Sequence, residues 1–437
     1  MSKRIKVGVV GCGYWGPNLI RNFRALPDCT LKVMCDLSEE RLKHLRQLYP
    51  EVKAETNYQE MLTGAGLDAV VIATAVRTHF PMAKASLMAG KHTFIEKPMA
   101  ASSAECDELV EIAKANGLVL MVGHTFLYSP AVRKIKEIVE WGDVGDIRYI
   151  SARRLNLGLF QKDINVAWDL APHDISIILH IMGELPITVN CRGSAHVTPG
   201  VEDVTSMCLT FRKDRSAIIH SSWLDPRKIR EMTIVGSKRM IVYDDVAPLE
   251  KIRVFDARVE RPPHYDTFAE FHYAYHYGDV YAPYIKQEEP LKTECQHFLE
   301  CIRHSKVPIS SGVQGAQLVK ILEASSLSLR QSGSPVRIAQ NGSFSSEPGL
   351  LVPRAAAARS AKPRAARKNG NGTLDLPVSA PGVGQPPVYA SGTGNGNGKG
   401  NGNGNGNGNG HAHGKDASAA AVSKATEIGN PTVTVQS

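Results

Sequence analysis

The sequence predicts an α/β protein: an N-terminal doubly wound parallel sheet followed by an α+β domain built on a large, mostly antiparallel sheet. Short apolar runs alternate with helical patterns over residues 5–121, and strand-like alternation dominates residues 204–243. From about residue 342 the composition collapses into Gly, Asn, Ala, Pro and Ser. We therefore expect two domains and a disordered low-complexity tail, over residues 1–123, 124–340 and 341–437.

Five apolar runs in the first domain have the length of buried parallel strands. They are Ile5–Val10, Leu31–Cys35, Ala69–Ala73, His92–Ile95 and Val119–Val122. Helical spacing separates them over residues 18–26, 38–48, 80–89 and 102–116. Ser38 and Ser102 are expected to cap two of these helices, because an acidic residue follows each of them in the next turn.

The second domain mixes helical and strand patterns. Helices are expected over residues 130–140, 169–182, 291–304 and 313–331. Strands rich in β-branched and aromatic residues, with polar residues between them, are expected over residues 204–211, 216–223, 231–235 and 240–243. This pattern favours an antiparallel sheet.

The net charge of +8 does not indicate a nucleic-acid-binding protein, because most of it belongs to the tail. Residues 342–437 contain nine Lys or Arg and four Asp or Glu. The basic stretch Arg354–Lys368 could contact an acidic partner, but a solvated tail is the simpler interpretation, and the sequence identifies no partner for it.

Other functional classes find no support in the sequence. The eight cysteines form no Cys-x-x-Cys pair, so neither a zinc ribbon nor a redox motif is indicated, and we expect no metal. No apolar run reaches the roughly 18 residues of a membrane span, and no secretory signal is apparent. These features favour a cytoplasmic location.

The segment Gly11-Cys12-Gly13-Tyr14-Trp15-Gly16 follows a predicted strand and precedes a predicted helix. In that context, the first glycine permits a tight turn, the second lets the backbone approach a pyrophosphate, and the third permits close helix–strand packing. The pattern predicts a dinucleotide site in which Tyr14 and Trp15 also contact the cofactor.

Asp36 ends the next strand, where a carboxylate accepts hydrogen bonds from ribose hydroxyls and repels a 2′-phosphate. Leu37 rather than Arg follows it, so NAD is favoured over NADP. Thr74 and His79 lie after a further strand, at the sheet edge where ligands bind, and are expected to border the cofactor.

Two further motifs suggest proton chemistry. Glu96-Lys97-Pro98 follows the strand at residues 92–95, so Lys97 could approach the nicotinamide and a substrate hydroxyl. Asp169 and His173 are spaced i, i+4, and a neighbouring carboxylate would orient the histidine and make it more basic. A zinc pair, or a capping Asp with a core His, are the alternatives for this second motif.

The glycine loop, Glu96-Lys97-Pro98 and Asp169…His173, in this order, resemble the glucose–fructose oxidoreductase/inositol dehydrogenase (Gfo/Idh/MocA) family over about residues 3–340. The resemblance implies a Rossmann domain, and an open second sheet that joins subunits into a dimer or tetramer. It also implies a catalytic Lys97, His173 as acid/base and Asp169 assisting or binding substrate. The Lys97–Pro98 bond is often cis in relatives, and we expect His124, with Glu96, near the nicotinamide.

Several stretches resemble the nucleotide-sugar branch of that family: Tyr128–Arg133, Arg153–Leu157, Phe160–Ile164, Trp168–His173, Tyr277–Tyr281 and Glu289–Glu294. This resemblance implies oxidation of a ring hydroxyl, at C3 of UDP-GlcNAc or UDP-GlcNAcA, with His173 as general base. A dehydrogenase or reductase of a free polyol, inositol or sugar, and a catalytically silent NAD-bound regulatory protein, are the alternatives.

The substrate itself is expected to meet Lys97, Asp169, His173 and two residues between the catalytic motifs, Arg154 and Asn156. With Arg153 and Lys162, the latter two form a donor-rich strand and loop, which suits a diphosphate or carboxylate. A solvated edge strand is the alternative interpretation.

Overall fold

The computed structural model describes residues 3–161, 164–260, 274–338 and 344–345, all within the first of two compact units of the chain. Most of the predicted tail lies outside the described residues. Its two described residues, Phe344–Ser345, form a short strand that pairs with residues 337–338. Among the described residues, no helix is long and apolar enough to cross a membrane.

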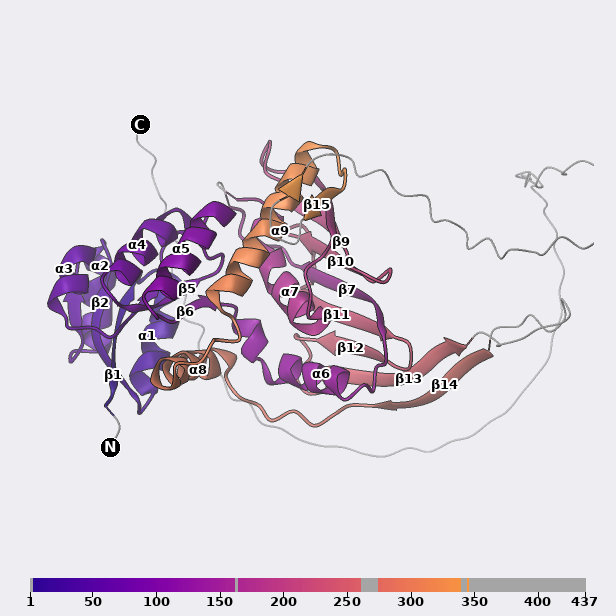
Figure 1. The fold of residues 1–437 in the computed structure, drawn as a ribbon, viewed down its shortest axis with the longest axis horizontal. Coiled ribbons are helices and arrows are strands. Elements are labelled where there is room, and N and C mark those ends of the chain that lie inside the picture. Colours follow the sequence, from indigo (N-terminus) through magenta and orange to yellow (C-terminus); the bar gives the residue numbers. More distant parts are fainter. Residues whose placement is uncertain (1–2, 162–163, 261–273, 339–343, 346–437) are drawn as a thin grey trace, which may run out of the picture. The chain divides into compact units, whose positions relative to one another are not determined.

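The first sheet has six strands in the order β3-β2-β1-β4-β5-β6, and every neighbouring pair is parallel. The strands are β1 (Ile5–Val10), β2 (Cys29–Cys35), β3 (Lys53–Glu55), β4 (Ala69–Ile72), β5 (His92–Glu96) and β6 (Leu120–Gly123). The helices are α1 (Gly16–Ala25), α2 (Glu39–Leu48), α3 (Tyr58–Gly64), α4 (Val76–Met88) and α5 (Ser103–Ala115). The predicted doubly wound fold is confirmed, with helices on both faces (Figure 1).

Local signals explain several of these boundaries. Ser38 accepts a hydrogen bond from the Arg41 amide, and Ser102 forms a capping box with Glu105, so both predicted caps are confirmed. The helix predicted to begin at residue 80 begins earlier, at Val76, and contains Pro81.

The second sheet has ten strands in the order β14-β13-β12-β11-β7-β10-β9-β8-β15-β16. They are β7 (Ile147–Leu155), β8 (Thr188–Ser194), β9 (Val204–Thr210), β10 (Ser216–Ser222), β11 (Ile229–Gly236), β12 (Met240–Asp244), β13 (Ile252–Glu260), β14 (Ala274–Tyr281), β15 (Val336–Ile338) and β16 (Phe344–Ser345). The β7–β10 pair is parallel and all other neighbours are antiparallel. This confirms the predicted mostly antiparallel sheet.

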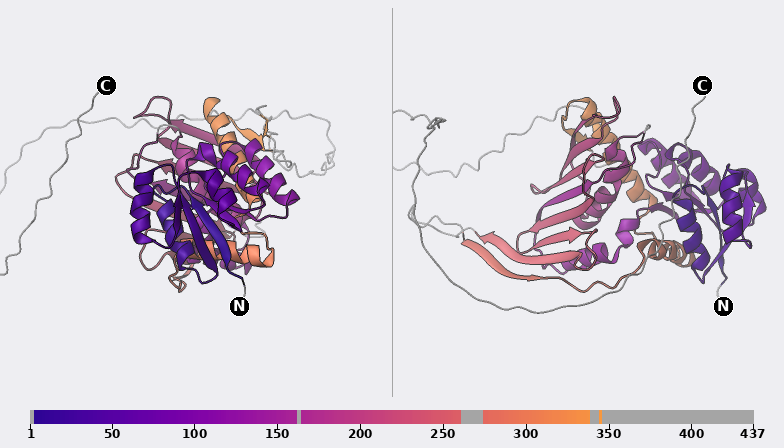
Figure 2. Two further views of the ribbon diagram at one scale, coloured as in Figure 1. Left: turned by 90° about the vertical axis from the view of Figure 1, so that its left-hand side faces the viewer. Right: turned by 180° about the vertical axis from the view of Figure 1, so that it is seen from behind.

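Helices α6 (Pro130–Glu140), α7 (Val166–Met182) and α9 (Gly312–Arg330) pack their apolar side chains on one face of this sheet. On the opposite face, Tyr149 is 41% exposed and Ile218 is 47% exposed. A short helix, η1 (Thr125–Tyr128), connects the two sheets. The two sheets stand side by side with α9 running along both (Figure 2).

Helix α8 (Pro290–His304) returns to the first sheet, although it follows the second sheet in sequence. Its Phe298 ring lies 6.3 Å from the ring of Phe23 and 5.7 Å from that of Phe94. The predicted boundary at residue 123 therefore marks where the chain leaves the first sheet, while the core around that sheet also includes later residues.

Candidate active site

The glycine loop between β1 and α1 has the close contacts that a dinucleotide loop requires. Gly11 has a φ of +94°, and a Cβ there would lie 2.5 Å from the Ala73 carbonyl oxygen. A Cβ on Gly16 would lie 1.8 Å from the Gly11 carbonyl oxygen. Around Gly13, by contrast, the nearest atom to a Cβ is Nη1 of Arg41 at 3.8 Å. The backbone at Gly13 is thus open to a ligand, as the fit of NAD demands.

Asp36 holds this loop from the end of β2. Its Oδ2 accepts a hydrogen bond from the Cys12 amide at 2.7 Å, and its Oδ1 accepts one from the Ser38 amide at 2.8 Å. Arg41, which the sequence did not single out, places Nη1 3.6 Å from Oδ2. The carboxylate is 9% exposed and keeps lone pairs that can accept ribose hydroxyls.

A cavity of about 730 Å³ lies between the two sheets and in front of this loop. The glycine loop contributes Tyr14 and Trp15, and the first sheet contributes Thr74, Glu96 and Lys97. The second domain contributes Asn156, Asp169, His173, Trp223, Arg230 and Asp245. Eight of the residues that the sequence singled out therefore line one cavity: Tyr14, Trp15, Thr74, Glu96, Lys97, Asn156, Asp169 and His173.

His79 is an exception, because it does not line this cavity. It is 1% exposed, and its ring nitrogens lie 2.9 Å from the Pro98 carbonyl oxygen and 3.0 Å from that of Thr74. The residue braces the backbone behind the cavity rather than bordering the cofactor, so that expectation is corrected. The Lys97–Pro98 bond that it supports is cis.

Lys97 is positioned by the second domain. Its ammonium donates a hydrogen bond to the Asp169 carbonyl oxygen at 3.0 Å and lies 3.6 Å from the Asp169 carboxylate Oδ1. The other carboxylate oxygen of Asp169 accepts a hydrogen bond from the indole of Trp223 at 3.1 Å. Both the lysine and the aspartate are about three-quarters buried, with exposed side-chain fractions of 22% and 25%.

His173 does not use Asp169 as its partner, and this corrects a second expectation. Nδ1 is buried and has no hydrogen-bond partner among the described residues. Burial, followed by the charges of Lys97 and Arg154, holds the pKa of His173 well below its ordinary value. The i, i+4 spacing put both side chains at the cavity, but the carboxylate is occupied by Lys97 and Trp223, so it does not make the histidine more basic.

His124 and Glu96 lie near the Lys97 charge, and Glu294 lies beside Glu96. His124 is 2% exposed and sits behind the cavity wall, between the lining residues Gly123 and Thr125; burial and the Lys97 charge lower its pKa to about 3. Burial raises the pKa of Glu96 to about 7. Glu294, from α8, accepts a hydrogen bond from Thr125 at 2.7 Å, and burial beside Glu96 raises its pKa well above the ordinary range. Burial therefore disfavours charge on all three groups.

Arg154 does not face the substrate space, contrary to expectation. It is 4% exposed and forms two hydrogen bonds with the Asp174 carboxylate, at 2.8 and 2.9 Å. Arg153 lies on the other face of β7 and pairs with Glu231, while Asn156 does line the cavity. Lys162 lies outside the described residues. Arg230 and Asp245 supply the charge on this wall, and sequence reasoning missed both.

Among the residues that the structure describes, no three His, Cys, Asp or Glu side chains are grouped so that they could hold a metal ion. The zinc alternative for Asp169 and His173 therefore lacks a third ligand in the described part of the chain. Proton chemistry beside a dinucleotide remains the use that this geometry supports.

Two family models match the chain. Residues 5–124 match the GFO/IDH/MocA oxidoreductase family with its NAD-binding Rossmann fold, and residues 132–242 match the GFO/IDH/MocA C-terminal domain. Myo-inositol 2-dehydrogenase of Thermotoga maritima is 26% identical over 344 residues, which cover 76% of this chain and 98% of that protein.

UDP-N-acetylglucosamine 3-dehydrogenase of Acidithiobacillus ferrooxidans is 28% identical over 243 residues, which cover 55% of this chain and 74% of that protein. A solved structure of that enzyme superposes with a TM-score of 0.63 at 24% identity, over 76% of this chain and 99% of that one. The structural likeness supports the fold, and the sequence matches extend through both sheets.

Proposed function

This chain belongs to the Gfo/Idh/MocA family and is an NAD-dependent oxidoreductase, and we propose that it oxidises a ring hydroxyl of a nucleotide-linked amino sugar. The hydroxyl is that on C3, and the substrate is UDP-GlcNAc or UDP-GlcNAcA. One observation carries the proposal: Lys97 and His173 line the same cavity as Tyr14 and Trp15 of the glycine loop. A relative named as a UDP-N-acetylglucosamine 3-dehydrogenase supports the choice of substrate.

The loop from Gly11 to Gly16 and the Asp36 carboxylate would hold the dinucleotide, and bound NAD supplies the acceptor for the hydride that leaves the sugar carbon. His173 takes up the hydroxyl proton. Because the low pKa of His173 keeps its ring neutral near neutral pH, the ring is ready to accept that proton. Lys97 stabilises the developing alkoxide with its charge.

Asp169 holds this lysine and leaves the histidine free. The carbonyl and carboxylate oxygens of Asp169 both contact the ammonium, which fixes its position at the cavity wall. In this proposal Thr74, Glu96 and His124 shape the nicotinamide end, with His124 acting from behind the lining residues.

A free cyclitol is the second candidate substrate. It is favoured by the match to a myo-inositol 2-dehydrogenase that spans 98% of that relative. A scyllo-inositol 2-dehydrogenase of Bacillus subtilis is also 24% identical over 352 residues. The same Lys97 and His173 chemistry would serve either substrate, so the difference lies in the wall that selects it.

The test is a substrate panel with the full chain and NAD, followed by NADH absorbance. UDP-GlcNAc and UDP-GlcNAcA are compared with myo-inositol, scyllo-inositol and free GlcNAc. We expect turnover with a nucleotide sugar, together with a higher melting temperature in its presence. Turnover with an inositol alone would replace the proposed substrate by the second candidate. Tight NAD binding without any turnover would instead support a regulatory protein.

We also propose that the outer face of the second sheet joins copies of the chain. Tyr149 and Ile218 are large apolar residues exposed on that face. Light scattering should show an oligomer, and Ile218→Glu should reduce its size.

A further inference from the structure

Two arginines lie directly opposite each other on the inner face of the second sheet. Arg154 of β7 and Arg230 of β11 are register partners in an antiparallel pair. Like charges in such a position destabilise a sheet unless other groups compensate them. The Phe126 ring contacts both, with its centroid 4.6 Å from the Arg154 guanidinium carbon and 5.9 Å from that of Arg230.

Arg154 is fully compensated. Its Nε and Nη2 donate to the two carboxylate oxygens of Asp174, and both side chains are 5% exposed. This bidentate pair is electrically neutral and is closed to a ligand.

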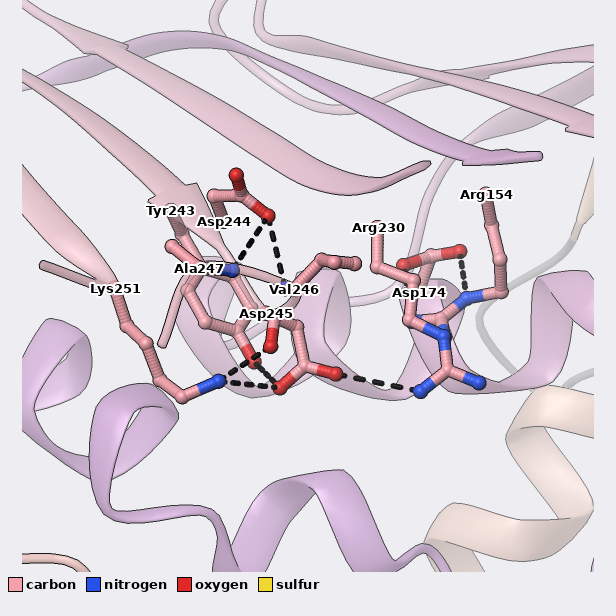
Figure 3. Close-up of polar contacts among 9 residues, drawn as sticks. All are labelled: Arg154, Asp174, Arg230, Tyr243, Asp244, Asp245, Val246, Ala247 and Lys251. Carbon is pink, nitrogen blue, oxygen red and sulfur yellow. Dashed lines mark hydrogen bonds and ion pairs between the residues drawn. The ribbon is translucent and has the colours of Figure 1, made fainter. Parts of the chain in front are cut away.

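Arg230 is only partly compensated. Its Nη1 lies 3.4 Å from Asp245 Oδ2, which is long for such a bond. The other oxygen of Asp245 accepts a hydrogen bond from the Tyr243 hydroxyl at 3.1 Å and lies 3.6 Å from the Lys251 ammonium. Lys251 also donates to the Asp245 carbonyl oxygen (Figure 3). One carboxylate thus pairs with two cations, so Arg230, Asp245 and Lys251 together carry one uncompensated positive charge.

That charge faces the catalytic cavity. Arg230 has a 37% exposed side chain and lines the cavity together with His173. The Phe126 ring centroid lies 4.9 Å from that of the His173 ring and 5.9 Å from the Arg230 guanidinium carbon. Asp245 also lines a neighbouring cavity of about 390 Å³, which Lys251 and Lys286 border. Asp245, the partner of Arg230, therefore lies where the substrate space adjoins a second, smaller cavity.

We propose that Arg230 is the anion anchor of the substrate: its guanidinium binds a carboxylate or phosphate group of the sugar derivative. A planar guanidinium pairs with either group through two parallel hydrogen bonds, and Arg230 uses only one donor on Asp245. The inference rests on the proposed function, and it identifies an anionic group as the part of the substrate that the enzyme recognises. The anion is either a ring carboxylate or the diphosphate of a nucleotide that continues toward the neighbouring cavity.

Binding of UDP, pyrophosphate and glucuronate to the NAD-loaded full chain, measured by calorimetry, tests the anchor. NAD is kept saturating so that pyrophosphate does not bind at the glycine loop. Arg230→Met should weaken binding of the anions by about 10- to 100-fold, and Arg230→Lys should weaken it less. Asp245→Asn should strengthen it, because the competing carboxylate charge is removed.

The matched control is Arg153→Met. Arg153 and Glu231 form the next pair along the same two strands, on the opposite face of the sheet, and they are joined by an ion pair. We expect this variant to bind all three anions as the wild type does. Loss of UDP and pyrophosphate binding alone in Arg230→Met identifies the diphosphate as the anchored group. Loss of glucuronate binding alone identifies a carboxylate.

The anchor is overturned if Arg230→Met binds the anions as well as the wild type does, or if the wild type binds none of them. Failure of the anchor is distinguishable from failure of the proposed function. Oxidation of UDP-GlcNAcA, which carries both a carboxylate and a diphosphate, with an unchanged KM in Arg230→Met would leave the function and remove the anchor. Arg230-dependent anion binding without oxidation of any nucleotide sugar would do the reverse.

Discussion

The Lys97 ammonium donates a hydrogen bond to the backbone carbonyl oxygen of Asp169, at 3.0 Å, and so connects the end of β5 with helix α7. The lysine follows a strand of the first sheet, whereas its partner belongs to the second domain. Because the two partners come from different domains, packing between the domains sets the position of the ammonium. His173, one helical turn after Asp169, lines the same cavity.

Replacing His173 by Asn should lower kcat by about 100- to 10,000-fold, because no side chain remains to take up the hydroxyl proton. NAD affinity, measured by calorimetry, should stay within about twofold, since His173 is not part of the glycine loop. His220→Asn is the matched control, because His220 belongs to β10 and its Nδ1 pairs with Ser206 instead. Near-normal turnover in His173→Asn would remove the histidine from the mechanism.

Replacing Lys97 by Met should raise the pKa of His173, because the Lys97 charge is one of the causes that hold it down. The neutral ring is the active form, so activity is lost as pH falls through this pKa. In Lys97→Met the acid limb of the residual activity should therefore move to higher pH. An NMR titration of the imidazole signals in the cofactor-free protein checks the same shift, and an unchanged or lower pKa would contradict it.

Local signals in the sequence predicted the first sheet and the glycine loop well. The loop is readable because Gly11 and Gly16 each make a backbone contact that leaves no room for a Cβ. Lys97 could be predicted because it follows a strand whose carboxyl end lies at the sheet edge where ligands bind, and it does line the cavity.

Contacts between segments far apart in the chain could not be predicted from the sequence. The i, i+4 rule placed Asp169 and His173 on one helix face, but it could not show that Trp223, 54 residues later, takes the carboxylate. From the sequence we expected Arg154 to supply the charge on the substrate wall, whereas Arg230 supplies it. The pairing of β7 with β11, which places Arg230 beside Arg154, joins segments far apart in the sequence, so local patterns did not reveal it. The return of α8 to the first sheet was missed for the same reason.

Replacing Asp36 by Ser should change the preference from NAD toward NADP. Arg41, 3.6 Å from the carboxylate, and the Ser38 hydroxyl at the start of α2 would then be free to meet a 2′-phosphate. We expect the ratio of kcat/KM for NADP to that for NAD to rise by at least about tenfold, equivalent to roughly 1.4 kcal/mol.

Adding Arg41→Ala to that variant should remove most of the gain, which separates a phosphate contact from mere loss of repulsion. If Asp36→Ser uses NADP no better with Arg41 than with Ala at position 41, then Arg41 does not contact the 2′-phosphate. Some loss of NAD affinity is expected, because Asp36 also accepts a hydrogen bond from the Cys12 amide of the glycine loop.

Replacing Asp174 by Asn should reduce the free energy of unfolding by about 3–5 kcal/mol, because it leaves the buried Arg154 charge without a carboxylate. Urea denaturation measures this loss. The double variant Arg154→Met/Asp174→Leu should recover most of it, since no uncompensated charge is then buried. Equal stability of Asp174→Asn and the wild type would show that the ion pair between Arg154 and Asp174 does not stabilise the fold.

The most direct measurement follows deuterium from UDP-GlcNAc labelled at C3 into the nicotinamide ring, with the full chain and NAD. The proposed function predicts deuterated NADH, a slower turnover than with unlabelled sugar, and no product with His173→Asn. Reduced cofactor without deuterium, or no reduction with either UDP-GlcNAc or UDP-GlcNAcA, would contradict the proposal that this protein oxidises the C3 hydroxyl of a nucleotide sugar.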